Sequence, residues 1–527
     1  MTSVTSSTDQ PESSARMSHR EVVQALSGLM VGMFVTILAS TVVSNALPRI
    51  IAELDGSQSV YTWIVTTELL AMTATVPLWG KLADLFSKKL LIQVSLSLFV
   101  VGSLLAGLTP NVGILILSRV VQGIGAGGVG SLALIAMAAM IPPRELGRYS
   151  GMFGAVFGVA TIAGPLIGGV LVDTSWLGWR WCFLIGVPFS VGTIALLQKT
   201  MHLPPAPRKR VSIDWLGAFL IVAGVCDLLI WSTLAGHQFA WGSWQTAVFV
   251  AGGVLLLTLA VWQESRAKEP IIPLSIFRNR TVALTIVASV LVGLAMFGGT
   301  VFLSQYFQIS LGKSPTVAGL MSLPLIFGLL VSSTLAGQLI TKYGRWKAYL
   351  VAGSVIMTAG MLLLSTIDAH TSVLKLSLFM AVLGIGVGML MQNLVLAAQN
   401  DVPAQELGAT TSSLTFFRSM GGAIGVSALG AVLANRVTSL LAERFGTAGT
   451  DGGTAKVPDL ATLPPGVLSV IRDVYGAATA DLFLVGTPIA LLAVIAVLFI
   501  KEKPLHTLSG DERRAQEEAA GAATVVP

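Results

Sequence analysis

Long apolar runs separated by short polar segments dominate the chain. A helix that crosses a membrane needs about 20 predominantly apolar residues, and the sequence contains fourteen such runs. The first six lie at residues 21–46, 60–81, 90–108, 112–140, 147–172 and 181–199. Two more follow at 214–235 and 245–263, and the last six lie at 281–309, 315–341, 347–367, 373–399, 406–435 and 478–500. The pattern predicts an all-α polytopic membrane protein with fourteen transmembrane helices.

Composition agrees with lipid as the solvent. Of the 527 residues, 54% are hydrophobic and only 11% are charged, whereas a soluble protein has about 25% charged residues. The bilayer is therefore the expected partner of most of the surface. The formal charge of +6 does not indicate nucleic-acid binding, because the basic residues lie in short loops between apolar runs. No obligate protein partner is predicted either.

The basic residues predict the orientation of the chain in the membrane. With the N-terminus inside, 22 Lys and Arg residues fall on the cytoplasmic side and eight on the outer side, as the positive-inside rule requires. We therefore expect a multi-pass protein of the cytoplasmic membrane with both termini inside. Residues 1–20 and 501–527 are expected to be disordered cytoplasmic tails. Residues 1–19 lack the apolar core of a signal peptide. An outer loop is expected at 437–477, and its segment LPPGVLSVIRDVYG indicates a short surface helix.

A weak internal repeat divides the chain. GKLADLFSKK (80–89) ends the second run and GQLITKYGRWK (337–347) ends the tenth, and both place a glycine before an apolar pair and a basic cluster. Internal repeats with a binding site near the membrane midplane are how many secondary transporters are built. We predict an N-terminal six-helix bundle at 21–199, two inserted helices within 200–268, and a C-terminal six-helix bundle at 269–500.

Four segments together resemble the major facilitator superfamily, in its fourteen-helix drug:proton antiporter branch. Three of them carry most of the likeness: GKLADLFSKK, LSRVVQGIGAGG (117–128) and GVATIAGPLIGG (158–169). WRWCFLIGVPFS (179–190) is similar to the usual entry of the sixth helix. The positions that match are Gly80, Asp84, Lys88 and Lys89 in the first segment, Arg119, Gln122 and Gly123 in the second, and Gly158, Gly164, Pro165, Gly168 and Gly169 in the third. Leu85 and Ser87 depart from the pattern.

The resemblance implies a function. It implies a proton-coupled exporter of lipophilic drugs or antibiotics that works by alternating access, driven by the proton gradient without a bound cofactor. Asp84 would hold the two bundles together in one state, although Lys88 and Lys89 are also explained as positive-inside anchors. The motif with Gly164-Pro165 and Gly168-Gly169 marks exporters in the family. Physically it indicates a kink and close helix packing.

One departure concerns proton coupling. The branch carries an aspartate in its first helix, and this chain has Ala39 at that position. Glu68 and Arg119 are predicted at about the same depth as Ala39, near the midplane, where an ionised carboxylate costs on the order of 3 kcal/mol. We predict that Glu68 takes the role of the missing aspartate, with Arg119 beside it. The alternative is that Glu68 is only a structural partner of Arg119.

Other intramembrane polar residues are weaker candidates. Asp227, on the inserted seventh helix, is either a second proton or cation site or a local polar contact. Arg418 could balance charge in the second half. Amides, aromatic residues and hydroxyl groups suit a cavity for small amphipathic substrates, although each alone could simply pack between helices; they are Thr41, Asn45, Gln305, Tyr306, Gln392, Asn393, Phe416 and Arg418.

Two other functions remain open at this stage. One is a dedicated exporter of a single endogenous metabolite or lipid, and the other is a membrane sensor or enzyme. The enzyme is disfavoured, because the sequence shows no nucleophile–base pair, no P-loop and no His-rich metal cluster, and Cys182 and Cys226 have no metal-ligand spacing. Substrate charge is open too: Glu68 would favour cations, whereas Arg119 and Arg418 would favour anions.

Overall fold

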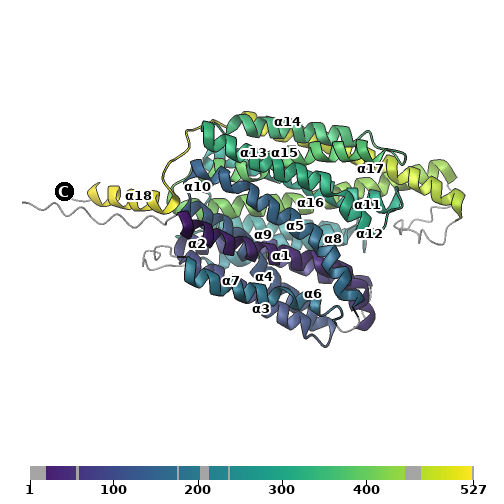
Figure 1. Cartoon of the computed structure of the whole chain (residues 1–527), viewed down its shortest axis with the longest axis horizontal. Coiled ribbons are helices and arrows are strands. Elements are labelled where there is room, and N and C mark those ends of the chain that lie inside the picture. The colour runs from purple at the N-terminus through teal and green to yellow at the C-terminus, as the bar shows by residue number, and fades with distance from the viewer. Residues whose placement is uncertain are drawn as a thin grey trace, which may run out of the picture.

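A computed structural model describes residues 19–54, 58–174, 177–201, 213–235, 238–445 and 464–524. No strand forms among these residues apart from one isolated bridge between Ala235 and Phe239. The helices lie side by side in an elongated bundle (Figure 1). The all-helical prediction is therefore confirmed.

The helices follow the predicted runs. The first half consists of α1 (His19–Glu53), α2 (Gln58–Leu85), α3 (Lys88–Gly107), α4 (Val112–Met140), α5 (Pro143–Asp173), α6 (Trp181–Leu184) and α7 (Gly186–Thr200). The inserted hairpin is α8 (Trp215–Leu234) and α9 (Trp244–Glu264). The second half consists of α10 (Ser275–Arg278), α11 (Arg280–Ile309), α12 (Pro315–Met321), α13 (Leu323–Tyr343), α14 (Lys347–Leu364), α15 (Val373–Gln399), η1 (Ala404–Glu406), α16 (Leu407–Phe445) and α17 (Pro465–Leu498), and α18 (Gly510–Thr524) follows it.

Twelve helical segments in the described part of the chain are long and apolar enough to cross a membrane. The two other long helices, α2 with 28 residues and α5 with 31, are outside this set. Both are less apolar on average than most of their neighbours: α2 contains Glu68, Lys81 and Asp84, and α5 is rich in glycine. The count of fourteen spans therefore stays a prediction.

Capping residues define where several helices begin or end. The carboxamide oxygen of Asn111 accepts a hydrogen bond of 3.0 Å from the Ile114 amide at the start of α4, and Asn279 does the same for the first amides of α11. Such N-caps satisfy donors that the helix itself leaves unpaired. Gly344 ends α13 with a φ of 71°, a left-handed conformation that suits glycine.

The contacts between helices follow a two-fold plan. Within the first half α1 packs on α5 and α4 packs on α2 and α3, whereas within the second α11 packs on α16 and α15 packs on α13 and α14. The two most extensive contacts between the halves are α2 with α16 and α5 with α13, and smaller ones join α4 to α16 and α5 to α15. The repeated glycine motif lies at the ends of α2 and α13, so each copy is on a helix that contacts the other half. The hairpin α8–α9 contacts α2 and α16 through α8.

The end of the bundle at which α1 begins and α17 ends is called the terminal end below. It lies on the left in Figure 1, where α10 and α18 are also found. The turns α2–α3, α4–α5, α13–α14 and α15–α16 lie at the same end, because the helices alternate in direction.

The structure describes helix in two segments that the sequence analysis placed outside the spans. The expected outer loop at 437–477 is shorter, because α16 continues to Phe445 and α17 already begins at Pro465. LPPGVLSVIRDVYG is thus no separate surface helix: from Pro465 it forms the first turns of α17, where Ile471 and Val474 are buried.

The C-terminal tail predicted to be disordered at 501–527 is ordered as far as the structure describes it, to Thr524. It runs across the terminal end and forms α18. Its polar side chains contact the loops there, an arrangement that the apolar pattern could not reveal. Of the N-terminal tail at 1–20, residues 1–18 lie outside the described residues, and His19 and Arg20 begin α1.

Candidate functional site

An ion pair between Glu68 and Arg119 lies inside the first half. Glu68 on α2 is 3% exposed and Arg119 on α4 is 1% exposed, and the carboxylate oxygen Oε2 accepts a hydrogen bond from the guanidinium group. The other oxygen, Oε1, is buried without a hydrogen-bond partner among the described residues. The structure thus pairs the two charges that the sequence analysis placed at the same depth.

The guanidinium group of Arg119 is held from several sides. Its Nε donates to the Ile64 carbonyl oxygen at 3.1 Å and its Nη1 donates to Gln122 Oε1 at 2.6 Å. Gln122 in turn donates to Ser103 Oγ on α3 at 2.9 Å. The ring of Phe183 lies 5.7 Å from the guanidinium carbon. Arg119 therefore keeps its position even when the bond to Glu68 is broken.

Gly123, the third matching position of this motif, brings α4 against α2. A methyl group on its Cα would lie 3.0 Å from the Cβ of Ala71 and 3.1 Å from the carbonyl carbon of Glu68. Small residues at such contacts allow helix backbones to approach closely in a membrane. The close approach places the carboxylate of Glu68 within reach of Arg119.

Ala39, where the family's branch carries an acid, lies in an apolar environment. It is buried with Val35, Phe99 and Ala126, and Met72 packs against the same cluster. Met72 and Ala126 lie one and two helical turns beyond Glu68 and Arg119, toward the terminal end. The first helix therefore contributes no charge at this depth, and the carboxylate comes from α2.

The structure places Asp227 inside the inserted hairpin. Its Oδ2 lies against α9, where a methyl group on Gly253 would be 2.9 Å away, and this oxygen has no hydrogen-bond partner in the described residues. Asp227 thus faces the second inserted helix. A role as a second proton or cation site stays a prediction.

The predicted cavity residues do not gather at one place. Thr41 donates to the Ala160 carbonyl oxygen at 3.3 Å, which joins α1 to α5. Tyr306 is fully buried and its hydroxyl donates to the Asp368 carbonyl oxygen at 2.6 Å, at the end opposite the terminal end. Gln305 is exposed. The side chain of Asn45 lies outside the described residues.

The remaining cavity candidates lie on α15 and α16. Gln392 lines a small crevice with residues of α4 and α5, including Leu134 and Leu146. Asn393 donates to the Met389 carbonyl oxygen of its own helix at 2.7 Å. Arg418 reaches the Met391 carbonyl oxygen at 3.4 Å, and Phe416 is buried. Only Gln392 of this group faces the other half, so the substrate cavity stays a prediction.

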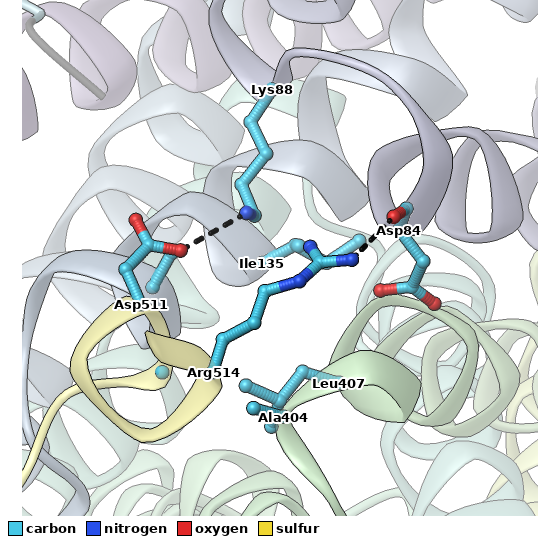
Figure 2. A pocket seen from close by; sticks show the side chains of 9 residues that line it. Asp84, Lys88, Ile135, Ala404, Leu407, Asp511 and Arg514 are labelled. Atoms are coloured by element: carbon cyan, nitrogen blue, oxygen red, sulfur yellow. Dashed lines mark hydrogen bonds and ion pairs between the residues drawn. The ribbon is translucent and has the colours of Figure 1, made fainter. Parts of the chain in front are cut away.

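Asp84 joins the two halves at the terminal end. Its two carboxylate oxygens accept hydrogen bonds from the amides of Gly408 and Ala409, each 2.8 Å long. These amides belong to the first turn of α16, so an acid on α2 caps a helix of the other half. A negative charge at a helix N-terminus is favourable. Figure 2 shows this carboxylate beside the start of the α16 ribbon.

Glycine residues allow the close approach on which that cap depends. A methyl group on Gly80 would lie 2.7 Å from the Gly408 carbonyl oxygen. The second contact between the halves is built in the same way: a methyl group on Gly147 of α5 would lie 2.8 Å from the Gly337 carbonyl carbon of α13. Gly80 and Gly337 are the corresponding glycines of the repeated motif. Gly147 and Gly408, their partners, were missed in the sequence, where nothing but the repeat hinted at a second contact.

Two glycines of the α5 motif join helices within the first half. Methyl groups on Gly164 and Gly168 would lie 2.5 Å from Thr41 Cβ and 2.7 Å from the Val42 carbonyl oxygen, so the motif brings α5 against α1. The surroundings of Pro165 and Gly169 lie outside what the structure describes. Lys89 donates to the Gln198 carbonyl oxygen of α7 at 2.8 Å. Lys88 instead pairs with Asp511 of α18 at 3.3 Å.

Comparison with known proteins gives these features a common context. The sequence profile described as "Major Facilitator Superfamily" matches residues 29–426. The chain belongs to this superfamily. The superfamily consists of membrane transporters, so the prediction that the chain is not an enzyme is confirmed.

Similar proteins in bacteria include named drug transporters. The multidrug transporter protein MdtP of Bacillus subtilis is 35% identical over 86% of this chain and 80% of its own length. Multidrug resistance protein 3 of the same species is 30% identical over 93% of this chain and 97% of its own length. An uncharacterized MFS-type transporter of Mycobacterium tuberculosis is 37% identical over 92% of this chain and 70% of its own length.

Solved structures share the fold at low sequence identity. The proton:xylose symporter XylE superposes with a TM-score of 0.59 at 14% identity and covers 94% of this chain and 99% of its own. The human organic anion transporter TETRAN superposes with a TM-score of 0.57 at 14% identity and covers 89% of this chain and 99% of its own. At this identity the likeness shows the transporter fold alone.

The Asp84 contact yields a test. Replacing a capping acid by alanine costs about 1 kcal/mol, so Asp84→Ala should raise the population that is open at the terminal end roughly fivefold. Spin labels at Arg148 on α5 and Tyr343 on α13, both exposed, report the separation of the halves by pulsed electron resonance. Glu443→Ala, which removes an exposed carboxylate of α16, is the matched control. An unchanged distance distribution in Asp84→Ala would show that the cap does not hold the halves together.

Proposed function

We propose that the chain is a proton-coupled exporter of lipophilic drugs or antibiotics in the cytoplasmic membrane. The observation that carries the proposal is the buried Glu68–Arg119 pair with one carboxylate oxygen left unpaired. The two Bacillus relatives named above, one a multidrug transporter and one a multidrug resistance protein, support the substrate class.

The pair can exchange a proton because its two forms are balanced by opposing forces. Burial disfavours an ionised carboxylate, whereas the adjacent guanidinium group favours it. When Glu68 takes up a proton, Arg119 loses its charged partner but keeps its hydrogen bonds to Ile64 and Gln122. A protonated Glu68 no longer binds α2 to α4 by charge. Proton uptake therefore changes the contact between two helices, one of which, α2, also carries the Asp84 cap.

The topology belongs to the same proposal. α2 and α5 would be roughly 42 and 46 Å long at 1.5 Å per residue, enough to cross a ~30 Å hydrocarbon core. We count both as spans, which makes fourteen, with the hairpin α8–α9 inserted between two six-helix bundles. The terminal end would face the cytoplasm, because it carries most of the lysine and arginine residues. The partners would be the bilayer, protons and small amphipathic substrates, and the proton gradient would replace any cofactor.

Alternating access would use the two contacts between the halves. Both lie at the terminal end, at Gly80–Gly408 and Gly147–Gly337, where the backbones approach closely, and Asp84 adds two hydrogen bonds across the first. Such contacts can separate without exposing large side chains to water. The structure corresponds in this proposal to the state in which the cytoplasmic side is closed.

The proton-coupling role of Glu68 is tested with Glu68→Gln in proteoliposomes. One pH unit supplies about 1.4 kcal/mol per proton, enough for about a tenfold concentration ratio of substrate. Glu68→Gln should lose this accumulation while still binding substrate, which is measured by tryptophan quenching. Glu443→Gln, the same change at an exposed position, should keep both. Adding Ala39→Asp should restore accumulation to the Glu68→Gln protein.

Two outcomes would contradict the proposal. Normal gradient-driven accumulation in Glu68→Gln would show that another group carries the proton. Accumulation by the native protein that ignores an imposed pH gradient would remove proton coupling altogether. In that case a dedicated exporter driven by another ion or by facilitated exchange becomes the better description.

A further inference from the structure

A second acidic site lies outside the residues used above, at the terminal end of the inserted hairpin. Asp214 precedes α8, and Glu264 is the last residue of α9. Glu269 follows in the loop toward the second half, and Lys81 of α2 forms an ion pair of 2.6 Å with it. The carboxylates of Asp214, Glu264 and Glu269 thus lie in one region with Lys81, whose ammonium group is already paired with Glu269.

One carboxylate oxygen of Asp214 and one of Glu264 have hydrogen-bond partners. Asp214 Oδ1 caps α8 by accepting from the Gly217 amide at 2.9 Å, and it also accepts from Gln263 Nε2 at 3.0 Å. Glu264 Oε2 accepts from the Ile272 amide at 3.0 Å. The second oxygen of each carboxylate is buried and has no hydrogen-bond partner in the described residues. Glu264 itself is only 5% exposed.

The two unpartnered oxygens point into the same space. A methyl group on Gly217 would lie 2.5 Å from Asp214 Oδ2 and 2.6 Å from Glu264 Oε1. Because Gly217 has no side chain, this space stays free, and both oxygens border it. The charged groups that act on Glu264 there are Asp214 and Lys81, and Lys81 is engaged by Glu269.

Glu264 is buried and Asp214 is half-buried, and ionising both carboxylates is unfavourable, because like charges at short range raise the energy of the doubly charged form. A buried acceptor without a donor is costly as well. We propose that Asp214 and Glu264 bind one proton between them at neutral pH. The protonated oxygen of one residue donates to the free oxygen of the other, so one proton satisfies both acceptors.

The acid pair (Asp214 with Glu264) lies where loss of its shared proton would affect how the hairpin contacts its neighbours. Glu264 holds the Ile272 amide of the segment that leads into α11, and Lys81 lies one helical turn from Asp84 on α2. Loss of the shared proton would drive Asp214 and Glu264 apart and loosen the hairpin from that segment. The inserted hairpin thereby contributes a proton-binding site of its own next to the contact between the halves.

Infrared difference spectroscopy of the protein in lipid nanodiscs tests the acid pair without any transport measurement, so its result is independent of the role of Glu68. At neutral pH, the wild type minus Glu264→Gln spectrum should contain the carbonyl band of one protonated carboxyl group. Wild type minus Asp214→Asn should contain one such band as well. The control Glu269→Gln, whose carboxylate is ion-paired and partly exposed, should remove an ionised carboxylate band only.

Two results would overturn the proposal of a shared proton. A loss of only ionised bands in both Glu264→Gln and Asp214→Asn overturns the shared proton. Bands in the wild-type spectrum that shift when sodium replaces potassium also overturn it, because an alkali cation would then fill the space. If Glu264→Gln does not fold, Asp214→Asn gives the same answer alone.

A different set of contacts carries a second inference, about the C-terminal strap, defined as residues 499–524. In the second half, Arg513 is 8% exposed and donates to the Val402 carbonyl oxygen at 2.5 Å, and Glu517 accepts from the Ala404 amide at 3.3 Å. In the first half, Asp511 pairs with Lys88 at 3.3 Å and Arg514 donates to the Asp84 carbonyl oxygen at 3.3 Å. Figure 2 shows Asp511 beside Lys88 and Arg514 beside Asp84.

The extended part of the strap also contacts both halves. The His506 carbonyl oxygen accepts from the Arg144 amide of α5 at 3.3 Å. The Lys503 carbonyl oxygen accepts from Trp346 Nε1 at 2.9 Å, and the Pro504 carbonyl oxygen accepts from Asn400 at 3.0 Å, both in the second half. Burial and the neighbouring Arg513 lower the pKa of His506, so this side chain is neutral at pH 7. The strap thus holds the two halves mainly through hydrogen bonds and the Lys88–Asp511 pair.

We infer that the C-terminal strap is a latch that stabilises the state closed at the terminal end. Opening of that end must break its contacts to one half, because the two halves move apart and the strap is bound to both. Arg514 contacts the carbonyl oxygen of Asp84 itself, near the end of α2, and Asp511 pairs with Lys88 at the start of α3.

The latch is tested with the spin labels at Arg148 and Tyr343. Asp511→Lys places two ammonium groups together and should raise the population with separated halves several-fold, and deletion of residues 510–527 should do the same. Lys88→Asp combined with Asp511→Lys restores opposite charges and should return the distribution toward the wild type. Glu443→Lys, a charge reversal at an exposed position of α16 far from the strap, is the control. Unchanged distances in both Asp511→Lys and the deletion would overturn the latch.

Discussion

The cost of placing charge in a bilayer governs this structure. An ionisable group inside the membrane must have a partner, face water or lose its charge. Glu68 and Arg119 meet this constraint by pairing with each other, and Arg119 is further held by a carbonyl oxygen and an amide side chain. The pair joins α2 to α4. One oxygen of the Glu68 carboxylate stays without a donor among the described residues.

At the terminal end the two halves approach each other closely through their backbones. Gly80 faces Gly408 and Gly147 faces Gly337, and Asp84 supplies two hydrogen bonds across the first of these contacts. Within a membrane, apolar side chains gain little from leaving lipid, so close backbone approach and hydrogen bonds carry much of the specificity.

Polar contacts at the terminal end connect elements that the duplicated fold does not require. Lys81 and Glu269 join α2 to the loop after the inserted hairpin, and Glu264 anchors the segment leading to α11. The strap contributes Asp511 and Arg514 to the same region. The hairpin and the strap thus both act on α2 near Asp84, where each can influence whether the halves stay together.

The sequence by itself determined the all-helical membrane fold and the positions of the long helices, and it indicated that Glu68 and Arg119 lie level with each other, because hydrophobic run length and helix rise are local properties. It also indicated Asp84 as a contact between halves through its motif. It did not reveal that Asp84 caps α16, that Gly147 meets Gly337, that Tyr306 bonds a distant loop, or that residues 501–524 are ordered against the bundle. These features depend on which residues from separate helices are brought together. A polar tail or a lone glycine has the same local pattern whether or not a partner lies opposite it, so only the tertiary structure decides.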